Sequence, residues 1–275
     1  MFVERGFDAH EGLKSFAYVS CLGRDRCTVS GCGSGRLVAL GGMRGSLLRF
    51  CVPSGARQFR VGARRIVLGR SVDGRAIVAF EIGDLDSRHR ELVVGCIHGD
   101  EAAGVAIARA LEHASPLGLD LWVVPVLNPD GVAAGTRVNA HRVDLNRNFP
   151  WRWRRLLGLF YSGPRPLSEP ESRIAYRLIR RLHPGVSIWF HQHLDLVDES
   201  GGSSALERRY AWLVGLRVVR LTREPGSVVG WENHRFPGTT AFVVELPAGR
   251  LPAGAVDRFA DAALVVGGRE SGGHG

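Results

Sequence analysis

The stretch Glu91–Glu101, with the sequence ELVVGCIHGDE, decides the fold and contains the first candidate site residues. Its apolar run is continuous, as expected of a strand that is buried on both faces of a parallel sheet. The run ends at His98, and Glu101 follows three residues later, where a helix is expected to begin. Zinc binds imidazole nitrogen and carboxylate oxygen, and a catalytic zinc keeps one open position. A histidine and a glutamate at this spacing also occur by chance in loops, so the pair alone does not establish a metal site.

The flanking sequence predicts an α/β sheet. A helical pattern over residues 101–114 separates the strand at 91–97 from a second apolar strand at 119–127, and strand, helix and strand together form a crossover unit. Asp73-Gly74 predicts a turn between two earlier strands. Further strands are expected at 63–69, 75–83, 186–190 and 239–246, and further helices at 171–182, 204–214 and 255–266. Ser168 to Glu171 has the pattern of a capping box at the start of the helix at 171–182.

The long segment between these elements, residues 128–167, is rich in Arg and Asn and has little regular pattern. Structureless segments of that length inside a compact domain are usually functional. Residues 1–57 also lack periodic patterning, and they are interpreted as a poorly ordered N-terminal extension without assigned chemistry. Residues 58–268 form the expected catalytic domain, and 269–275 form a Gly-rich tail.

Five cysteines, an odd number without regular metal spacing, argue against a disulfide framework and against a zinc ribbon. Cys96 is expected to be a small buried hydrophobic residue. The formal net charge of +9 raises nucleic acid as a partner. Lys14 is the only lysine, however, so nearly all basic residues are arginines. A preference for Arg over Lys together with many Gly and Ala residues is typical of coding bias, and no nucleic-acid partner is predicted.

The cellular location is inferred from the same sequence. No apolar run is long enough to span a membrane, and the N-terminus lacks the features of a secretory signal. We therefore expect a cytoplasmic protein, while the oligomeric state is left open.

Two further ionisable residues lie at or within otherwise apolar strands, His191 after residues 186–190 and Glu245 within residues 239–246. Such groups are costly to bury unless they are paired or bind a metal. Ligands bind at the carboxyl ends of strands in open α/β sheets, so His98, Glu101 and His191 are expected to form one metal site there. His193, two residues beyond His191, would face the same side of a strand, and the residues alone do not decide between the two.

Several motifs occur together and in order between residues 67 and 249. They are HGDE at 98–101, NPDG at 128–131, GTRVN around Arg137, DLNRNFP at 144–150, SEPE at 168–171, FHQ at 190–192 and FVVELPAG at 242–249. With these motifs the chain resembles the zinc carboxypeptidase family, and its compact length is most similar to the murein peptide amidase branch. The resemblance implies a three-layer α/β/α fold with a mixed, mostly parallel central sheet.

The resemblance also implies roles for individual residues. His98, Glu101 and His191 would bind one Zn²⁺ ion, and Glu245 would act as the general base and acid. Arg137 would stabilise the oxyanion of the tetrahedral intermediate. Asn146 and Arg147 would hold a free carboxylate of the substrate, a role that suits the planar, bidentate guanidinium group. Without the motifs, Arg137, Arg142 and Arg147 could equally form a solvated basic loop.

The expected reaction is hydrolysis of an amide bond next to a free carboxylate, in a murein-type peptide that contains γ-D-glutamyl-diaminopimelate. The alternatives are a carboxypeptidase of ordinary peptides, a zinc deacylase of N-acyl amino acids, and a non-catalytic binding module. NPDG and DLNRNFP favour the peptidases over the deacylases, and the intact Glu245 argues against a binding module. Digestive carboxypeptidases close a tyrosine over the substrate, whereas residues 221–227, LTREPGS, contain none, which predicts a more open site.

Overall fold

The computed structural model describes residues 17–21, 27–31, 36–41, 47–52, 58–59, 61–222 and 224–268. It divides the chain into two units, Met1–Arg60 and Val61–Gly275. In the first unit β1 (Ala17–Cys21), β2 (Cys27–Gly31) and β5 (Gln58–Phe59) form one antiparallel sheet, and β3 (Arg36–Gly41) pairs with β4 (Leu47–Val52). The sequence pattern did not predict these strands. The interpretation of residues 1–57 as a poorly ordered extension stays a prediction.

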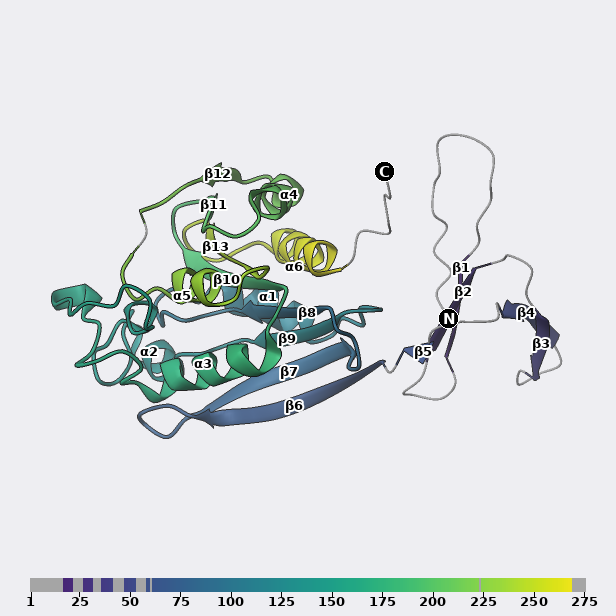
Figure 1. Cartoon of the computed structure of the whole chain (residues 1–275), viewed down its shortest axis with the longest axis horizontal. Helices are drawn as coiled ribbons and strands as arrows, with labels where there is room; N and C mark the ends of the chain where they lie inside the picture. The colour runs from purple at the N-terminus through teal and green to yellow at the C-terminus, as the bar shows by residue number, and fades with distance from the viewer. Residues whose placement is uncertain are drawn as a thin grey trace. The chain divides into compact units, whose positions relative to one another are not determined.

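The second unit is built on an eight-stranded sheet, which is labelled in Figure 1. Its strand order is β12 (Arg217–Val219), β11 (Leu196–Asp198), β13 (Thr240–Leu246), β10 (Val186–Gln192), β8 (Arg90–Val94), β9 (Asp120–Val124), β7 (Ala76–Asp84) and β6 (Val61–Arg70). The four central strands, β13, β10, β8 and β9, run parallel, whereas β11 and β7 pair antiparallel to them. The mixed, mostly parallel sheet predicted from the sequence is therefore confirmed.

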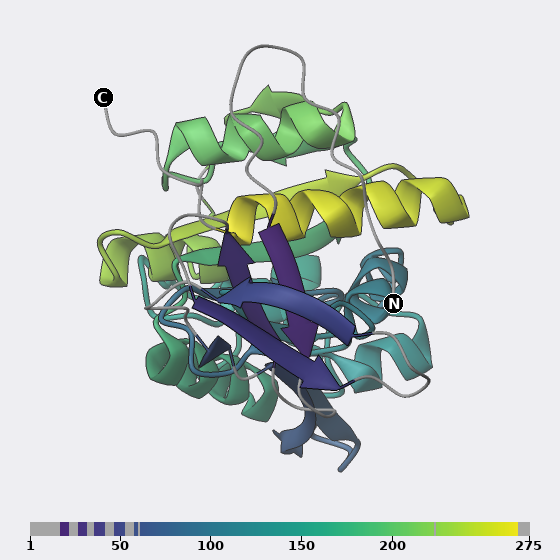
Figure 2. The ribbon, with the colours of Figure 1, turned by 90° about the vertical axis from the view of Figure 1, so that its right-hand side faces the viewer.

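Helices cover both faces of this sheet, because successive strand residues point to opposite sides. On one face Val93 packs in a core with α1 (Gly104–Leu111), α4 (Ser204–Val214) and α6 (Ala253–Gly267). On the other face Leu92 and Val94 pack in a core with α3 (Pro170–Leu182) and α5 (Val228–Arg235). The two helix layers lie on either side of the sheet in Figure 2. The three-layer α/β/α architecture is confirmed.

The start of α3 differs from the predicted capping box. Glu169 is the N-cap residue and makes no side-chain cap hydrogen bond, and Pro170 opens the helix. The carboxylates of Glu169 and Glu171 instead accept hydrogen bonds from the Asn139 side chain, at 2.8 and 3.0 Å. The motif therefore holds the long segment between β9 and α3 against the start of the helix. This tertiary role cannot be predicted from the local pattern.

That long segment is more ordered than its sequence suggests. It contains α2 (Pro129–Ala134) and two short 3₁₀ turns, Leu145–Arg147 and Gly158–Phe160. In the part of the chain that the structure describes, no helix has the length and apolar character needed to cross a membrane.

Candidate metal centre and active site

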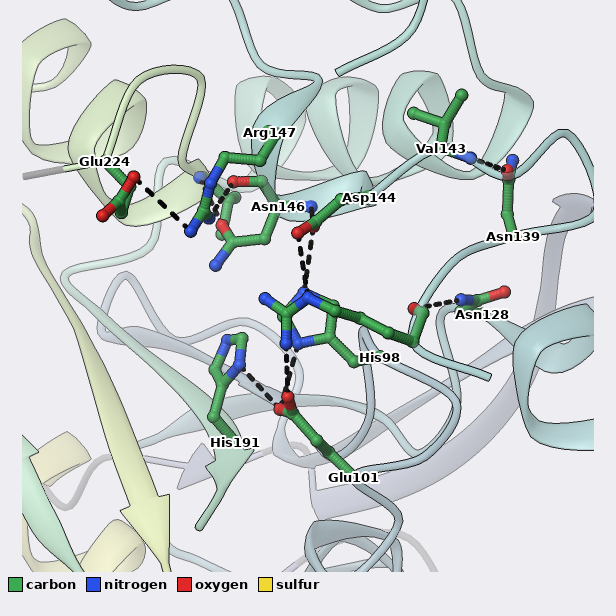
Figure 3. Close-up of polar contacts among 12 residues, drawn as sticks. His98, Glu101, Asn128, Asn139, Val143, Asp144, Asn146, Arg147, His191 and Glu224 are labelled. Carbon is green, nitrogen blue, oxygen red and sulfur yellow. Dashed lines mark hydrogen bonds and ion pairs between the residues drawn. The ribbon is translucent and has the colours of Figure 1, made fainter. Parts of the chain in front are cut away.

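The predicted site residues meet at the carboxyl ends of the central parallel strands. His98 lies beyond the end of β8, His191 is near the end of β10, and Glu245 is opposite His191 in the register of β10 and β13. Parallel neighbours end at the same edge of a sheet, so residues nearly 150 positions apart in the sequence become neighbours. Figure 3 shows His98, Glu101 and His191 converging at this edge.

Three potential ligand atoms, one each from His98, Glu101 and His191, lie within 4.8 Å of one another, and all three residues are buried. Nδ1 of His98 and Nδ1 of His191 each lie 3.0 Å from Oε2 of Glu101. Nδ1 of His98 is nevertheless without a hydrogen-bond partner among the described residues. Two imidazoles and one carboxylate are the donor set of a catalytic zinc site. The buried Nδ1 of His98 lacks a hydrogen-bond partner within the described part of the chain, and a metal ion would provide a partner there, so the residues fit a metal ion.

His193 is not part of this cluster. β10 ends at Gln192, and the His193 side chain beyond it is exposed, whereas His191 is buried against Glu101. The structure thus brings His191, and not His193, to the other two residues. The strand periodicity could not make this distinction because the strand ends between the two histidines.

Asp144 contacts both His98 and Arg137 and so orients the cluster. Its Oδ1 lies 3.1 Å from Nε2 of His98, and its Oδ2 accepts a hydrogen bond from Nε of Arg137 at 3.0 Å. NH1 of Arg137 lies 2.6 Å from Oε1 of Glu101, so Arg137 bridges the two buried carboxylates. A carboxylate behind a ligating histidine fixes its ring orientation and raises its basicity. Asp144 had no predicted role, although it is the first residue of the DLNRNFP motif.

The charges of the two carboxylates are stabilised by these contacts. Burial opposes ionisation of Glu101, but its close contacts with the imidazoles of His191 and His98 outweigh burial and hold its pKa well below the usual range. Burial likewise opposes ionisation of Asp144, and the neighbouring His98 and Arg137 hold the pKa of Asp144 well below its usual range. Both groups are therefore anionic at neutral pH, as a cationic metal site requires.

Two glycines of the sequence motifs make the site compact. A Cβ atom on Gly99 would lie 1.9 Å from the carbonyl carbon of Gly131. The HGDE loop can therefore pack on the NPDG segment only if residue 99 is a glycine. Asn128 is the N-cap of α2 and accepts a hydrogen bond from the Gly131 N–H at 2.9 Å. These contacts explain why the HGDE and NPDG motifs occur together.

Glu245 lies beside His191 with part of its side chain accessible. Burial raises its pKa, and the neighbouring His191 partly opposes that effect. Its Oε2 has no hydrogen-bond partner among the residues that the structure describes. A carboxylate with a raised pKa and a free oxygen next to a metal site has the properties of a general base.

Asn146 and Arg147 lie where two chain segments, around residues 146–149 and 226–228, are joined by hydrogen bonds. The Asn146 side chain accepts a hydrogen bond from the N–H of Val228, and Gly226 accepts one from the N–H of Phe149, both at 2.9 Å. Arg147 is buried, which lowers its pKa, and its Nε has no hydrogen-bond partner in the described structure. A buried guanidinium group with an unsatisfied N–H is suited to bind an anion.

Two residues beside Arg147 were not singled out from the sequence. Glu224 lies 3.6 Å from NH2 of Arg147, as Figure 3 shows. The ring of Phe160 lies over both arginines, with its centroid 5.4 Å from Cζ of Arg147 and 5.6 Å from Cζ of Arg137. The alternative of a solvated basic loop fits only Arg142, which is exposed.

Cys96, at the end of the opening strand, is fully buried, and its Sγ donates a hydrogen bond to the carbonyl oxygen of His98 at 3.0 Å. Burial raises its pKa to about 12. Cys96 is therefore a neutral packing residue at physiological pH, as expected from the sequence.

Comparisons with known proteins agree with this geometry. The model of the succinylglutamate desuccinylase/aspartoacylase catalytic domain matches residues 88–264. Murein peptide amidase A of Escherichia coli strain K12 is 32% identical over 183 residues, which cover 59% of this chain and 74% of that protein. The crystal structure of the murein-tripeptide amidase MpaA from Escherichia coli O157 superposes with a TM-score of 0.64 at 26% identity, covering 76% of this chain and 93% of that one.

A more distant structure shares the fold alone. Carboxypeptidase A from Helicoverpa armigera superposes with a TM-score of 0.62 at 17% identity, covering 74% of this chain and 67% of that one.

The fold and the relatives together define the class of protein, a hydrolase related to the metallocarboxypeptidases. The chain belongs to the family of the succinylglutamate desuccinylase/aspartoacylase catalytic domain, and its relatives include the murein peptide amidases. The resemblance to the zinc carboxypeptidases drawn from the motifs is thus confirmed.

Proposed function

We propose that this protein hydrolyses the amide bond between γ-D-glutamate and diaminopimelate in murein-type peptides, with one zinc ion held by His98, Glu101 and His191. The observation that carries the proposal is the convergence of these three buried side chains at one point beside Arg137, Glu245 and Arg147. The relatives named as murein peptide amidases support this substrate class.

A zinc ion at this centre supplies Lewis acidity, which lowers the pKa of an attacking water and polarises the scissile carbonyl group. Glu245 takes the proton of the water through its unpaired Oε2 and later gives it to the leaving nitrogen. Arg137 donates hydrogen bonds to the developing oxyanion, since Glu101 and Asp144 hold its guanidinium group in place before substrate arrives.

The free carboxylate of the leaving amino acid binds to Arg147 and to the side-chain amide of Asn146. Arg147 is preorganised by its NH1 hydrogen bond to the Asn146 carbonyl oxygen, at 2.9 Å, and by the Phe160 ring. A carboxylate bound there would bring the scissile bond next to the metal centre. Positioning of this kind contributes several kcal/mol to catalysis, on the order of 7–11 kcal/mol at best.

A zinc deacylase of N-acyl amino acids is the second candidate, because the matching family model carries that description. Such a substrate also presents an amide next to a free carboxylate. The two candidates differ in the acyl group, a succinyl or acetyl group in one case and a γ-glutamyl peptide in the other.

The deciding experiment is a substrate panel with purified, zinc-loaded protein. L-alanyl-γ-D-glutamyl-diaminopimelate, a blocked dipeptide with a free C-terminus and N-succinylglutamate are compared, each with and without a chelator. We expect chelator-sensitive release of diaminopimelate from the first and little turnover of the others. Rapid turnover of N-succinylglutamate alone would favour the deacylase, and no turnover of any substrate by metal-loaded, folded protein would refute the proposal.

A further inference from the structure

A cavity of about 750 Å³ lies beside the metal centre. It shares Glu101 and Arg137 with the centre, but Asn146 and Arg147 do not line it. If the leaving amino acid binds at Arg147, the acyl part of the substrate extends past Arg137 into this cavity. Its size is that of a typical small-ligand pocket.

The far wall of the cavity is the turn Ala248–Arg250, and Gln192 holds this turn in place. The Gln192 side chain donates hydrogen bonds to the carbonyl oxygens of Pro247 and Gly249, both at 2.9 Å. Its Oε1 accepts a hydrogen bond from the N–H of Ala103, and its own N–H binds Glu101 at 3.2 Å. The turn is therefore fixed relative to the metal centre by the residue that follows His191.

The two arginines of the cavity wall differ in whether they have an ion-pair partner. The two carboxylate partners of Arg137, Glu101 and Asp144, already neutralise that arginine, and only Glu101 of the two lines the cavity. Arg250 also lines the cavity, is exposed, and has neither an ion pair nor a hydrogen bond to any described residue. His193 and Asp100 line the same cavity and are exposed, and they add a ring nitrogen and a carboxylate.

From this arrangement we infer that Arg250 binds a free carboxylate on the acyl side of the substrate and so selects acyl groups that carry one. The inference rests on the proposed function. In a γ-D-glutamyl group the carbon that carries the α-carboxylate is two methylene groups away from the scissile carbonyl, whereas the main chain of an ordinary α-peptide carries no carboxylate on the acyl side. A succinyl group also carries a terminal carboxylate, so the same chemistry would serve the deacylase candidate.

The positions of the other two groups are consistent with this selection. His193 can donate a ring N–H to the same carboxylate, because it lines the cavity together with Arg250. Asp100 would repel a carboxylate at the Arg137 end, and it can instead accept the N–H of the peptide bond that precedes the γ-glutamyl residue.

The test compares two substrates that differ only in this carboxylate. One is L-alanyl-γ-D-glutamyl-diaminopimelate, and the other is the same peptide with the α-carboxylate amidated, an isoglutaminyl peptide. We expect the wild-type protein to cleave the acid with a kcat/KM about tenfold or more above that of the amide, since a charged hydrogen bond is lost. Arg250→Gln should lower kcat/KM for the acid by about tenfold and leave the amide unchanged.

Arg109→Gln is the matched control, because Arg109 is an exposed arginine that lines the adjacent pocket and not this cavity. It should leave both rates unchanged. Equal rates for acid and amide with wild-type protein, or an equal loss on both substrates in Arg250→Gln, would overturn the inference.

A binding measurement separates this inference from the proposed function. Calorimetry of zinc-loaded protein with L-alanyl-D-glutamate and with L-alanyl-D-isoglutamine, which lack the scissile bond, measures binding at the subsite without turnover. Tighter binding of the acid by the wild type, lost in Arg250→Gln, supports the subsite even if neither tripeptide is cleaved. Equal binding of both dipeptides contradicts it, whatever the activity.

Discussion

Asp144→Asn tests whether zinc affinity depends on the Asp144 carboxylate that contacts His98. The substitution keeps the size of the side chain and removes its charge. In the wild type Asp144 is fully buried and contacts Nε2 of His98 at 3.1 Å and Nε of Arg137 at 3.0 Å. An asparagine can accept from one of these groups, but it cannot provide the anion that both of them face.

The size of the effect follows from these two contacts. A hydrogen bond to a charged group contributes about 1.5–3 kcal/mol. Loss of a partner behind a ligating histidine typically costs about 10- to 100-fold in metal affinity. Arg137 keeps its 2.6 Å contact with Glu101, so its oxyanion role is weakened and not abolished. We therefore expect the zinc dissociation constant to rise by about 10- to 100-fold and kcat/KM at saturating zinc to fall by about 10-fold or more.

The assay is a competition titration of zinc against a chromophoric chelator, followed by peptide hydrolysis at saturating zinc. Asp130→Asn is the matched control, since Asp130 is also a buried carboxylate, paired with Arg75 at 2.7 Å and accepting from Ser71 at 2.7 Å, outside the metal cluster. The control should lower the Tm and leave the zinc affinity of the folded protein unchanged. A folded Asp144→Asn protein whose zinc affinity lies within about twofold of the wild type would refute the reasoning.

Three further predictions concern other parts of the catalytic domain. Glu245→Gln should lower kcat by about 100-fold or more in the hydrolysis assay, because the base is lost, while zinc and substrate still bind. Phe160→Ala should raise KM by about threefold to tenfold in steady-state kinetics, because the ring lies over both arginines. Glu232 is fully buried, and burial raises its pKa from 4.5 to about 7, so the folded state binds its proton more tightly than the unfolded state. Stability should therefore fall as the pH rises from about 4.5 to 7, by about 2–3 kcal/mol for this group, as measured by urea unfolding.

Each of these predictions has its own control. Undiminished turnover by Glu245→Gln would exclude Glu245 as the base. Leu159→Ala changes a neighbouring, exposed residue of the same loop and should leave KM unchanged, and an equal effect of both loop variants would mean that the Phe160 ring has no special role. Glu232→Gln cannot ionise, so the stability difference between wild type and variant must change with pH, and a constant difference would contradict the assignment.

Much of the fold was predictable because it depends on local patterns. The apolar runs that became β8, β9, β10 and β13 were expected as buried strands, since a parallel strand must be apolar on both faces. The short α2 and β11 were missed because their sequences are too brief to show a period. The prediction of a capping box at Ser168 was wrong because Glu169 and Glu171 bind Asn139, a residue some thirty positions away.

The sequence by itself determined the chemistry available at the site. It placed His98 with Glu101 at the end of one apolar strand and His191 and Glu245 at the ends of others, and the order of the motifs indicated the family. These features are readable because strand periodicity and metal-ligand chemistry act through residue types and short spacings.

Only the tertiary structure decided which of the available groups work together. It left His193 outside the cluster of His98, Glu101 and His191, placed Asp144 against His98, and set Phe160 over two arginines. It also placed Arg250, without a partner in the described structure, on the wall of the cavity beside the metal centre. Such contacts join residues that are distant in the sequence, and their directions follow from how the packed layers orient each side chain. For the stretch Glu91–Glu101, the sequence supplied two candidate ligands, and the packed sheet brought the third candidate, His191, and the groups that contact them.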